Sequence, residues 1–331
     1  MLEDLNNVMR TRRSQSSGNP VSPRTAEVAP DATEGARHHV PVLLHEALTA
    51  LQIRTDDIVV DATLGGAGHA RAIADNLGVQ GILVGFDLDQ DAIGRSKKAL
   101  QKALPRTYLV QANFRNLAPE LEKLGIKKIT KALFDLGWSS YQLDSGRGFS
   151  FLTDEPLLMT YAKEGGTLTA ETIVNEWGEE SLADVIFGWG QERYARRIAK
   201  MIVDRRKVRP FQTARELAET IREAVPPPAR RGRLHPATKT FQALRIAVND
   251  ELGALTEGLK AAWDSLAPGG RIAIITFHSI EDGVVKRAFA ELEKKGEGIR
   301  ITRKPIPASE DEIRENPRAR SAKLRVIQKN S

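Results

Sequence analysis

Short apolar runs alternate with helical segments through the first part of the chain. Between residues 43 and 135, stretches such as IVVD (58–61) are separated by segments whose apolar side chains recur every three or four positions. The predicted elements are helix 43–51, strand 58–61, helix 69–77, strand 82–87, helix 90–104, strand 108–111, helix 119–124 and strand 131–135. This alternation is typical of an α/β protein with an open parallel sheet and helices on both faces.

The alternation stops after residue 135. From 138 to about 240 the pattern predicts loops and amphipathic helices, including 191–206 and 213–224, and no strand. Strand character returns at RIAIITF (271–277), after the turn APGG. We therefore expect a doubly wound sheet domain formed by 39–139 and 241–331, with a helical domain inserted at 140–240.

Residues 1–38 are rich in Ser, Pro, Arg and Ala and show neither helical nor strand periodicity. We predict a disordered N-terminal tail there. Its five arginines are balanced by five acidic residues, unlike an organellar transit peptide, and it contains no apolar core of a secretory signal. No apolar run approaches the roughly 18 residues of a membrane span, so a soluble, cytoplasmic protein is expected.

Charge is unevenly distributed along the 331 residues. The formal net charge is +6, but 193–239 alone contains 14 Lys or Arg and four Asp or Glu, a local balance of +10. A single arginine on a helix face is usually just solvated. The cluster as a whole predicts a phosphate-contacting surface, with candidates Arg230, Arg231 and Arg233 in the segment PPPARRGR.

A glycine-rich turn follows the first strand in the stretch IVVDATLGGAGH (58–69). Gly65, Gly66 and Gly68 let the backbone turn sharply and approach a ligand closely, although many strand-to-helix corners need glycine only for steric reasons. Asp87 ends the next strand, 19 residues beyond Gly68. That spacing is close to the one at which an acid in a dinucleotide-type fold accepts ribose hydroxyls.

Acidic residues end three of the predicted strands. Because ligands of open α/β sheets lie beyond the carboxyl ends of the strands, we expect Asp61, Asp87 and Asp135 to converge on one crevice. Asp61 has an equal alternative as a helix cap or turn former. For Asp135 a functional role is favoured, because Gly137 and the serine pair after it suit a loop packed around a ligand.

With these pieces assembled, the sequence resembles the MraW family of bacterial 16S rRNA (cytosine-N4) methyltransferases from His39 to Lys329. The resemblance rests on HHVPVLLHEAL, DATLGGAGH, DLGWSSYQLDSGRGFSF, GQERYARRIAK, HPATKTFQALRIAVNDEL, APGGRIAIITFHSIED and ENPRARSAKLRV, in the family's order. It implies a Rossmann-like methyltransferase sheet, S-adenosyl-L-methionine (AdoMet) as methyl donor and an inserted substrate domain. It further implies action on a cytidine in the decoding region of the small ribosomal subunit, with no metal.

The resemblance also implies particular site residues. The cofactor-binding positions fall on Ala67, Gly68, His69, Asp87, Phe114, Asp135 and Gln142. Asp135 is in addition the candidate catalytic residue, as acceptor of a hydrogen bond from the cytosine amine. His69 has an alternative as a first-turn helix residue, and Phe114 as a core residue.

Residues after the returning strand are second candidates for lining the base pocket. They lie in FHSIED and are His278, Ser279, Glu281 and Asp282. For Ser279 and Asp282, capping of the following helix is an equal alternative. The segment therefore predicts either a pocket wall or a helix start.

The sequence departs from the family pattern beside the proposed base pocket. The usual PLDMR is PLLMT here (156–160), so Leu158 and Thr160 replace an acid and a base, and Trp138 and Tyr141 replace smaller residues. This departure motivates an alternative function, a non-catalytic AdoMet- or RNA-binding ribosome-assembly factor. An NAD(P)-dependent oxidoreductase shares the glycine turn, but the basic insert disfavours it. The absence of cysteine excludes disulfides, Cys-ligated zinc and cytosine C5 methylation through a cysteine adduct.

Overall fold

The computed structural model describes residues 41–137, 140–162, 168–232 and 234–331. The predicted N-terminal tail, Trp138 and Arg233 lie outside these residues. Among the described residues, no helix is long and apolar enough to cross a membrane.

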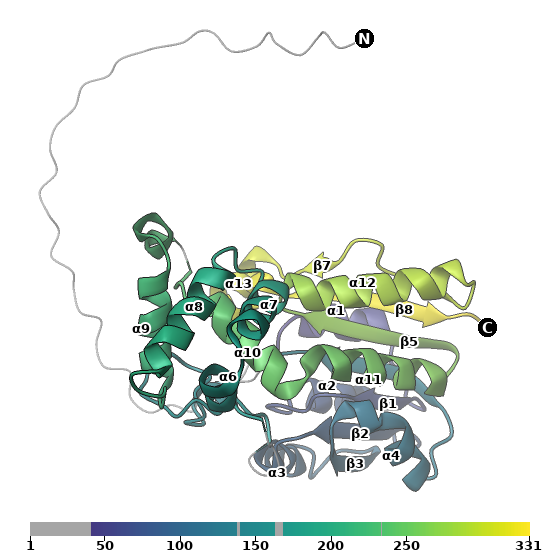
Figure 1. The fold of residues 1–331 in the computed structure, drawn as a ribbon. Helices are drawn as coiled ribbons and strands as arrows, with labels where there is room; N and C mark the ends of the chain where they lie inside the picture. Colours follow the sequence, from purple (N-terminus) through teal and green to yellow (C-terminus); the bar gives the residue numbers. More distant parts are fainter. Residues whose placement is uncertain (1–40, 138–139, 163–167, 233) are drawn as a thin grey trace, which may run out of the picture. The chain divides into compact units, whose positions relative to one another are not determined.

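Parallel strands form one side of the described sheet, from its edge strand β3 to β5 (Figure 1). They are β1 (Ile58–Asp61), β2 (Ile82–Asp87), β3 (Arg106–Gln111), β4 (Ile129–Asp135) and β5 (Leu266–Thr276). β1 pairs with both β2 and β4, and the order is β3-β2-β1-β4-β5. The strand order therefore reverses between β1 and β4, which is where sheets of this kind bind their ligands.

Helices cover both faces of the sheet because successive strand residues point to opposite sides. Val59 and Leu83 pack into one apolar cluster with α1 (Leu44–Leu51), α2 (Gly68–Asn76) and α3 (Gln90–Ala99). Val60 and Val84 pack into the cluster on the other face. The helices of that face are α4 (Leu117–Lys123), α11 (Glu251–Ser265) and α12 (Ser279–Lys294). The doubly wound α/β fold expected from the sequence is confirmed.

The C-terminal part of the sheet corrects the expectation of an all-parallel sheet. β8 (Lys323–Lys329) runs antiparallel to β5, and β6 (Gly298–Arg300) and β7 (Ile306–Pro307) pair antiparallel with β8. The sheet is therefore mixed. Arg325 lies buried in β8 and its Nε donates to Asp282 Oδ1 of α12 at 2.6 Å. This buried charge obscures the strand in the sequence.

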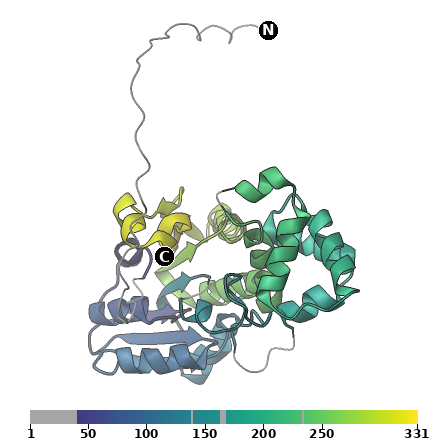
Figure 2. The same ribbon diagram turned by 90° about the vertical axis from the view of Figure 1, so that its left-hand side faces the viewer.

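The helices between β4 and α11 lie beside the sheet in Figure 2. They are α5 (Ser140–Leu143), α6 (Ala170–Glu176), α7 (Glu179–Gly190), α8 (Ala195–Arg206), α9 (Ala214–Ala224) and α10 (Thr238–Asn249), with the 3-10 segment η2 (Pro227–Arg231). α6 to α10 share one apolar cluster. α9 has the features that made its helical pattern recognisable in the sequence. Thr213 Oγ1 caps its start by accepting from Glu216 N. Leu217 and Ile221, one turn apart, are fully buried.

Candidate functional site

A single cavity of about 1430 Å³ lies at the carboxyl ends of β1, β2 and β4. It is lined on the sheet side by the glycine-rich loop, Asp87 and Asp135. Its other walls come from the inserted helices and from the 3-10 segment η3 (Pro317–Ser321) near the C-terminus. The cavity therefore lies where the strand order reverses. It is at the carboxyl ends of the strands, where the sequence analysis expected a crevice.

At Gly68 the glycine-rich loop packs closely on the protein itself, which is the steric alternative for its composition. Ala67 takes the left-handed conformation with φ 65°, directly before α2. A Cβ on Gly68 would lie 2.9 Å from the ring of Pro41, so this glycine is needed for packing. Asp87 closes the loop from below, since its Oδ2 accepts from Gly65 N at 2.9 Å and its Oδ1 accepts from Asp89 N at 2.8 Å. Burial raises the pKa of Asp87 despite these hydrogen bonds.

Asp61, His69 and Asp135 form a group at the base of the cavity, in which Asp61 and His69 are buried and Asp135 is partly buried. His69 Nδ1 lies 3.4 Å from Asp135 Oδ2, and its Nε2 lies 3.1 Å from the Val42 carbonyl. A carbonyl can only accept, so Nε2 carries a proton. Burial acts to lower the pKa of His69, but the hydrogen bond to Asp135 and the charges of Asp135 and Asp61 raise it overall. His69 is therefore a buried imidazole held between the Val42 carbonyl and Asp135, which goes beyond the alternative of a plain first-turn helix residue.

Two carboxylate oxygens of this group are unsatisfied among the described residues. Asp61 Oδ2 and Asp135 Oδ1 are buried without a hydrogen-bond partner. Burial raises the pKa of Asp61 to about 7; the charge of His69 and the Thr63 backbone N–H oppose this rise. Asp61 Oδ1 also accepts from Thr63 N at 3.2 Å, so the expected turn-forming role is present alongside the buried charge. Buried polar atoms without partners are uncommon in native proteins, and these two oxygens are free to accept hydrogen bonds from a ligand.

Phe114 and Gln142 also line the cavity. Phe114 begins η1 (Phe114–Asn116), is half-buried, and packs edge-on against Phe134 with ring centroids 5.5 Å apart. It is thus part of the core and of the cavity wall at once. Of the predicted cofactor residues, Ala67 shapes the loop rather than lining the cavity.

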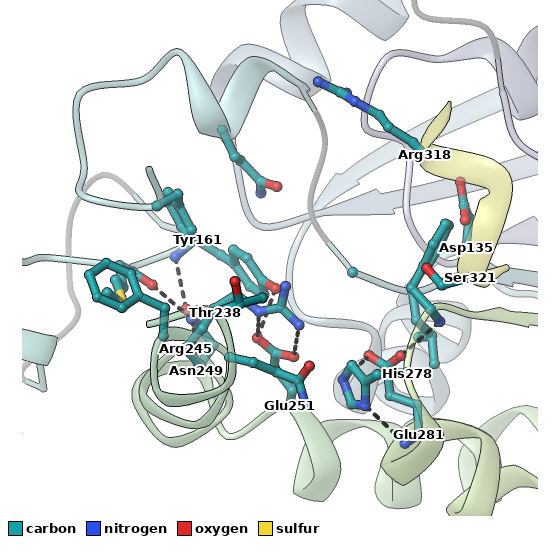
Figure 3. Close-up of a pocket in the computed structure, with 18 of the residues that line it drawn as sticks. Asp135, Tyr161, Thr238, Arg245, Asn249, Glu251, His278, Glu281, Arg318 and Ser321 are labelled. Carbon is teal, nitrogen blue, oxygen red and sulfur yellow. Dashed lines mark hydrogen bonds and ion pairs between the residues drawn. The ribbon is translucent and has the colours of Figure 1, made fainter. Parts of the chain in front are cut away.

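The wall opposite Asp135 is a polar network that the sequence did not indicate (Figure 3). Arg245 binds Glu251 through two hydrogen bonds, Nε to Oε1 at 2.7 Å and Nη2 to Oε2 at 2.9 Å. Tyr161 Oη donates to the same Glu251 Oε1 at 2.8 Å. Burial raises the pKa of Tyr161 well above its usual value, so the phenol stays protonated.

The segment after GFSF is tied to α10 by its backbone. Asn249 Oδ1 accepts from Tyr161 N and its Nδ2 donates to the Met159 carbonyl, both at 2.8 Å. Arg147 Nη1 donates to the carbonyls of Thr160 at 2.9 Å and Tyr161 at 2.6 Å. Position 160 thus contributes a carbonyl that any residue could provide.

Tyr141, another departure from the family pattern, has a contact of its own. The Arg95 guanidinium lies 4.0 Å from the centroid of the Tyr141 ring. Arg95 Nη2 also donates to the Gly65 carbonyl at 3.3 Å. Tyr141 therefore packs on a residue that holds the glycine-rich loop.

The segment FHSIED divides between the cavity and the sheet. His278 and Glu281 line the cavity, and His278 Nε2 lies 3.1 Å from Glu281 Oε1. His278 itself caps α12, its Nδ1 accepting from Glu281 N at 3.3 Å. The predicted capping by Ser279 and Asp282 is therefore wrong. Ser279 Oγ donates to Gln191 Oε1 at 2.7 Å, and Asp282 binds Arg325.

Glu251, His278 and Glu281 each bring one potential ligand atom within 4.8 Å of the others. Both oxygens of Glu251 are already bound by Arg245 and Tyr161. Burial would raise the pKa of Glu281, but His278 lowers it overall, so this carboxylate stays ionised beside the imidazole. The group is therefore held together by hydrogen bonds and ion pairs of the protein.

Of the predicted basic candidates, Arg230 and Arg231 are described, and neither lines the cavity, although the neighbouring Ala229 and Gly232 do. Arg230 Nε and Nη2 donate to the carbonyls of Val225 and Glu223, both at 3.1 Å, so this arginine stabilises the end of α9. Arg231 is exposed. Sequence reasoning missed Arg318 and Arg320, exposed residues of η3 that line the cavity from the C-terminal side. Both lie in the motif ENPRARSAKLRV, which is the sequence feature that could have identified them as site residues.

Comparisons with known proteins agree with this arrangement. The model of the MraW methylase family matches residues 36–330. The chain is 47% identical over 309 residues to "Ribosomal RNA small subunit methyltransferase H" of Heliobacterium mobile, covering 88% of this chain and 99% of that protein. The protein of the same name from Clostridioides difficile is 45% identical over 308 residues, covering 88% and 99%.

A solved rRNA methylase from Streptococcus thermophilus aligns over 91% of this chain and 100% of its own, with 13% identity and a TM-score of 0.42. Family membership follows from the family model and from the two relatives, each of which is covered over 99% of its length. The chain belongs to the MraW methylase family.

Proposed function

We propose that the protein transfers a methyl group from AdoMet to the exocyclic N4 amine of a cytidine in the 16S rRNA of the small ribosomal subunit, in the cytoplasm and without a metal. One observation carries the proposal: strand-end carboxylates and a glycine-rich loop share one cavity with a basic helical insert. The family and the names of its relatives agree with this activity.

The residues present fit AdoMet. Asp87 lies at the end of β2 with both oxygens already ordered by backbone N–H groups, and would accept the ribose hydroxyls. Phe114 would lie against the adenine, with Gln142 nearby. The methionine end would face the loop before α2, His69 and the unsatisfied Asp61 Oδ2. A cationic sulfonium and ammonium suit a pocket floor containing three carboxylates.

The cofactor supplies an electrophilic sulfonium methyl, and the protein must present the amine to it. The lone pair of the cytosine amine is conjugated with the ring, so hydrogen bonding and alignment must favour its attack. Asp135 Oδ1 is buried, unsatisfied and adjacent to the loop, and would accept a hydrogen bond from the amine. As the N–C bond formed, the S–C bond to the methyl group would break and S-adenosylhomocysteine would leave. Asp135 would stabilise the positive charge on the nitrogen and accept its proton, which then passes to solvent.

His69 fixes the orientation of Asp135. It lies 3.4 Å from Oδ2, so Oδ1 is the oxygen that keeps its acceptor capacity for the amine. Asp135 N donates to Thr63 Oγ1 at 2.9 Å, so the end of β4 is tied to the glycine-rich loop. Amine and methyl group are therefore positioned by connected parts of the sheet edge.

Incubation with labelled AdoMet and either naked rRNA or 30S subunits, followed by mapping of the modified base, tests the proposal. Label at the N4 position of one cytidine is expected. Binding of AdoMet and RNA without transfer would instead support the non-catalytic assembly factor.

Asp87→Ala tests the cofactor site separately. It should weaken AdoMet binding by roughly 10- to 100-fold, because a hydrogen bond to a charged acceptor contributes about 1.5 to 3 kcal/mol. Calorimetry measures this, with Asp75→Ala, an exposed acid of α2, as the matched control. Unchanged affinity in folded Asp87→Ala would contradict the assignment.

A further inference from the structure

The cavity is larger than a cofactor and one base require. Small-molecule sites usually enclose about 300 to 1,000 Å³. This cavity measures about 1430 Å³ and continues past Tyr161 to the insert. Its far end is lined by Phe151, Leu234, His235 and Lys239, residues that neither the cofactor nor the methyl acceptor uses.

An aromatic stack forms this far end. The rings of Phe151 and His235 are stacked, with centroids 4.7 Å apart and an interplanar angle of 25°. Phe151 also packs edge-on against Phe241, with ring centroids 5.1 Å apart. Phe241 is buried in the core of the insert, whereas His235 is exposed. The stack thus runs from a rigid core to an exposed flat ring on the cavity wall.

The imidazole of His235 is fixed in its plane and uncharged. Its Nδ1 accepts from Ala237 N at 3.2 Å, which places the proton of the neutral ring on Nε2. Partial burial and the neighbouring Arg222 lower the pKa of His235. Beside it, the side chain of Leu234 is 61% exposed, an unusual position for a large apolar residue at a cavity edge.

We propose that the Phe151–His235 stack is a second subsite, which binds the unpaired base of a nucleotide flanking the target cytidine. One face of the imidazole is covered by Phe151, so the base stacks on the other. Aromatic stacking is the common way in which proteins hold unpaired RNA bases, and the surrounding cations of the insert suit the phosphates. The inference rests on the proposed RNA substrate and specifies how the site holds it.

A double-mutant cycle between protein and RNA tests the subsite. The probes are pentaribonucleotides with a central cytidine, in which each flanking nucleotide is replaced in turn by an abasic residue. Affinities are measured at low salt for the wild-type protein, His235→Ala, His235→Phe and the control His45→Ala, an exposed histidine of α1 outside this cavity.

For the wild-type protein, one abasic position should weaken binding by about 5- to 150-fold, the range for one stacked base. His235→Ala should bind the intact probe more weakly by a similar factor and lose its sensitivity to that abasic position. His235→Phe keeps a stacking ring but loses the bond to Ala237 N, so it should bind like wild type. A structural role through that bond would instead impair both variants.

The proposal would be overturned if the losses of binding free energy caused by His235→Ala and by each abasic replacement were additive. It would also be overturned if the wild-type protein showed no measurable binding of the probe. Methylation of rRNA by His235→Ala and wild type is followed in parallel. Absence of methylation by the wild type contradicts the proposed function, whereas the binding cycle decides the subsite independently.

Discussion

At the scale of single residues, the main feature of the site is a cluster of carboxyl groups at the base of the cavity, whose pKa values depend on one another. Asp61 is fully buried, with His69, Asp87 and Asp135 all close enough to influence its pKa. His69 is the counter-charge within this group, and its pKa is raised by the neighbouring carboxylates against the effect of burial. One carboxyl group is therefore held near neutrality until a cationic ligand arrives.

Asp61→Asn should raise the free energy of unfolding relative to wild type, by an amount that increases with pH. The folded pKa of Asp61 is about 7 and its ordinary value is 3.8, so the native state binds more protons between these values. Wild-type stability contributed by this group is present below about pH 4 and is lost as pH rises to about 7. Asparagine cannot ionise, so its advantage should grow over this interval, by at most about 4 kcal/mol.

Urea unfolding at several pH values measures this difference, with Asp56→Asn, an exposed acid before β1, as control. Parallel curves for wild type and Asp61→Asn would show that Asp61 titrates normally. A second result is expected for AdoMet binding. The cationic ligand should lower the pKa of Asp61, so the protein should release a proton when AdoMet binds near pH 6 to 7. Calorimetry in buffers of different ionisation enthalpy detects that proton.

Asp135→Asn should separate catalysis from binding. It preserves shape but removes the charge that stabilises the developing ammonium, so the methylation rate should fall by about 10²-fold or more while RNA affinity changes little. The pKa of His69 should also fall, because its main stabilising partner is lost. Single-turnover methylation, RNA binding and NMR titration of His69 provide the measurements. Equal losses of rate and RNA affinity would make Asp135 a general binding or folding residue.

The residues predicted from the sequence are those whose position follows from strand ends and the glycine turn. Asp87 and Asp135 could be placed because parallel strands bring their carboxyl ends to one edge. Tyr161, Arg245 and Glu251 could not, because they converge from a loop and two helices that no periodicity relates. The roles of Ser279 and Arg230 differ from expectation because local partners, Gln191 and the end of α9, were invisible in the sequence.

At the scale of elements, the wall opposite Asp135 is a loop without regular secondary structure that is held by a few side chains. Gly148 has φ +77°, and a Cβ there would lie 2.3 Å from the Pro156 carbonyl. Arg147 and Asn249 satisfy the backbone of the segment that ends at Tyr161. The loop is therefore positioned by hydrogen bonds from Asn249 of α10 and by those of its own Arg147.

Asn249→Ala should loosen this wall. It leaves Tyr161 N–H and the Met159 carbonyl without their partner, which costs about 1 to 3 kcal/mol in partly buried surroundings. Thermal unfolding should report that loss, and kcat/KM for rRNA should fall more than AdoMet affinity. Asn76→Ala on exposed α2 is the matched control and should change stability by less than about 0.5 kcal/mol. Similar stabilities of the two variants would contradict the role of Asn249.

The elements predicted from hydrophobic patterning differ from the observed ones mainly at their ends. Strands β1 and β2 have the predicted bounds, whereas β4 and β5 begin earlier, at Ile129 and Leu266. The predicted helix 90–104 ends at Ala99, because Leu100 leaves helical geometry and a turn follows. β8 was missed because its alternating apolar and charged residues include Arg325, whose burial depends on Asp282 from a distant helix.

At the scale of the whole molecule, exposed cations stand on two sides of the cavity. The insert contributes the +10 segment, including Arg231, and η3 contributes Arg320 from the C-terminal region. Arg231 and Arg320 are far apart in sequence, but Gly232, next to Arg231, lines the same cavity as Arg320. An RNA strand that delivers a base to Asp135 would thus have phosphate contacts on both sides of the target.

Arg231→Ala combined with Arg320→Ala should therefore weaken RNA binding and flatten its salt dependence. Each lost phosphate contact reduces the slope of log affinity against log salt by about 0.7 to 0.9, so the double variant should lose about 1.4 to 1.8. Lys286→Ala with Arg287→Ala removes the same charge from the exposed face of α12, outside the cavity, and should leave the slope almost unchanged. AdoMet affinity should be unaffected in both. If both pairs reduce the slope equally, the cations act through net charge and the RNA has no fixed path across the cavity.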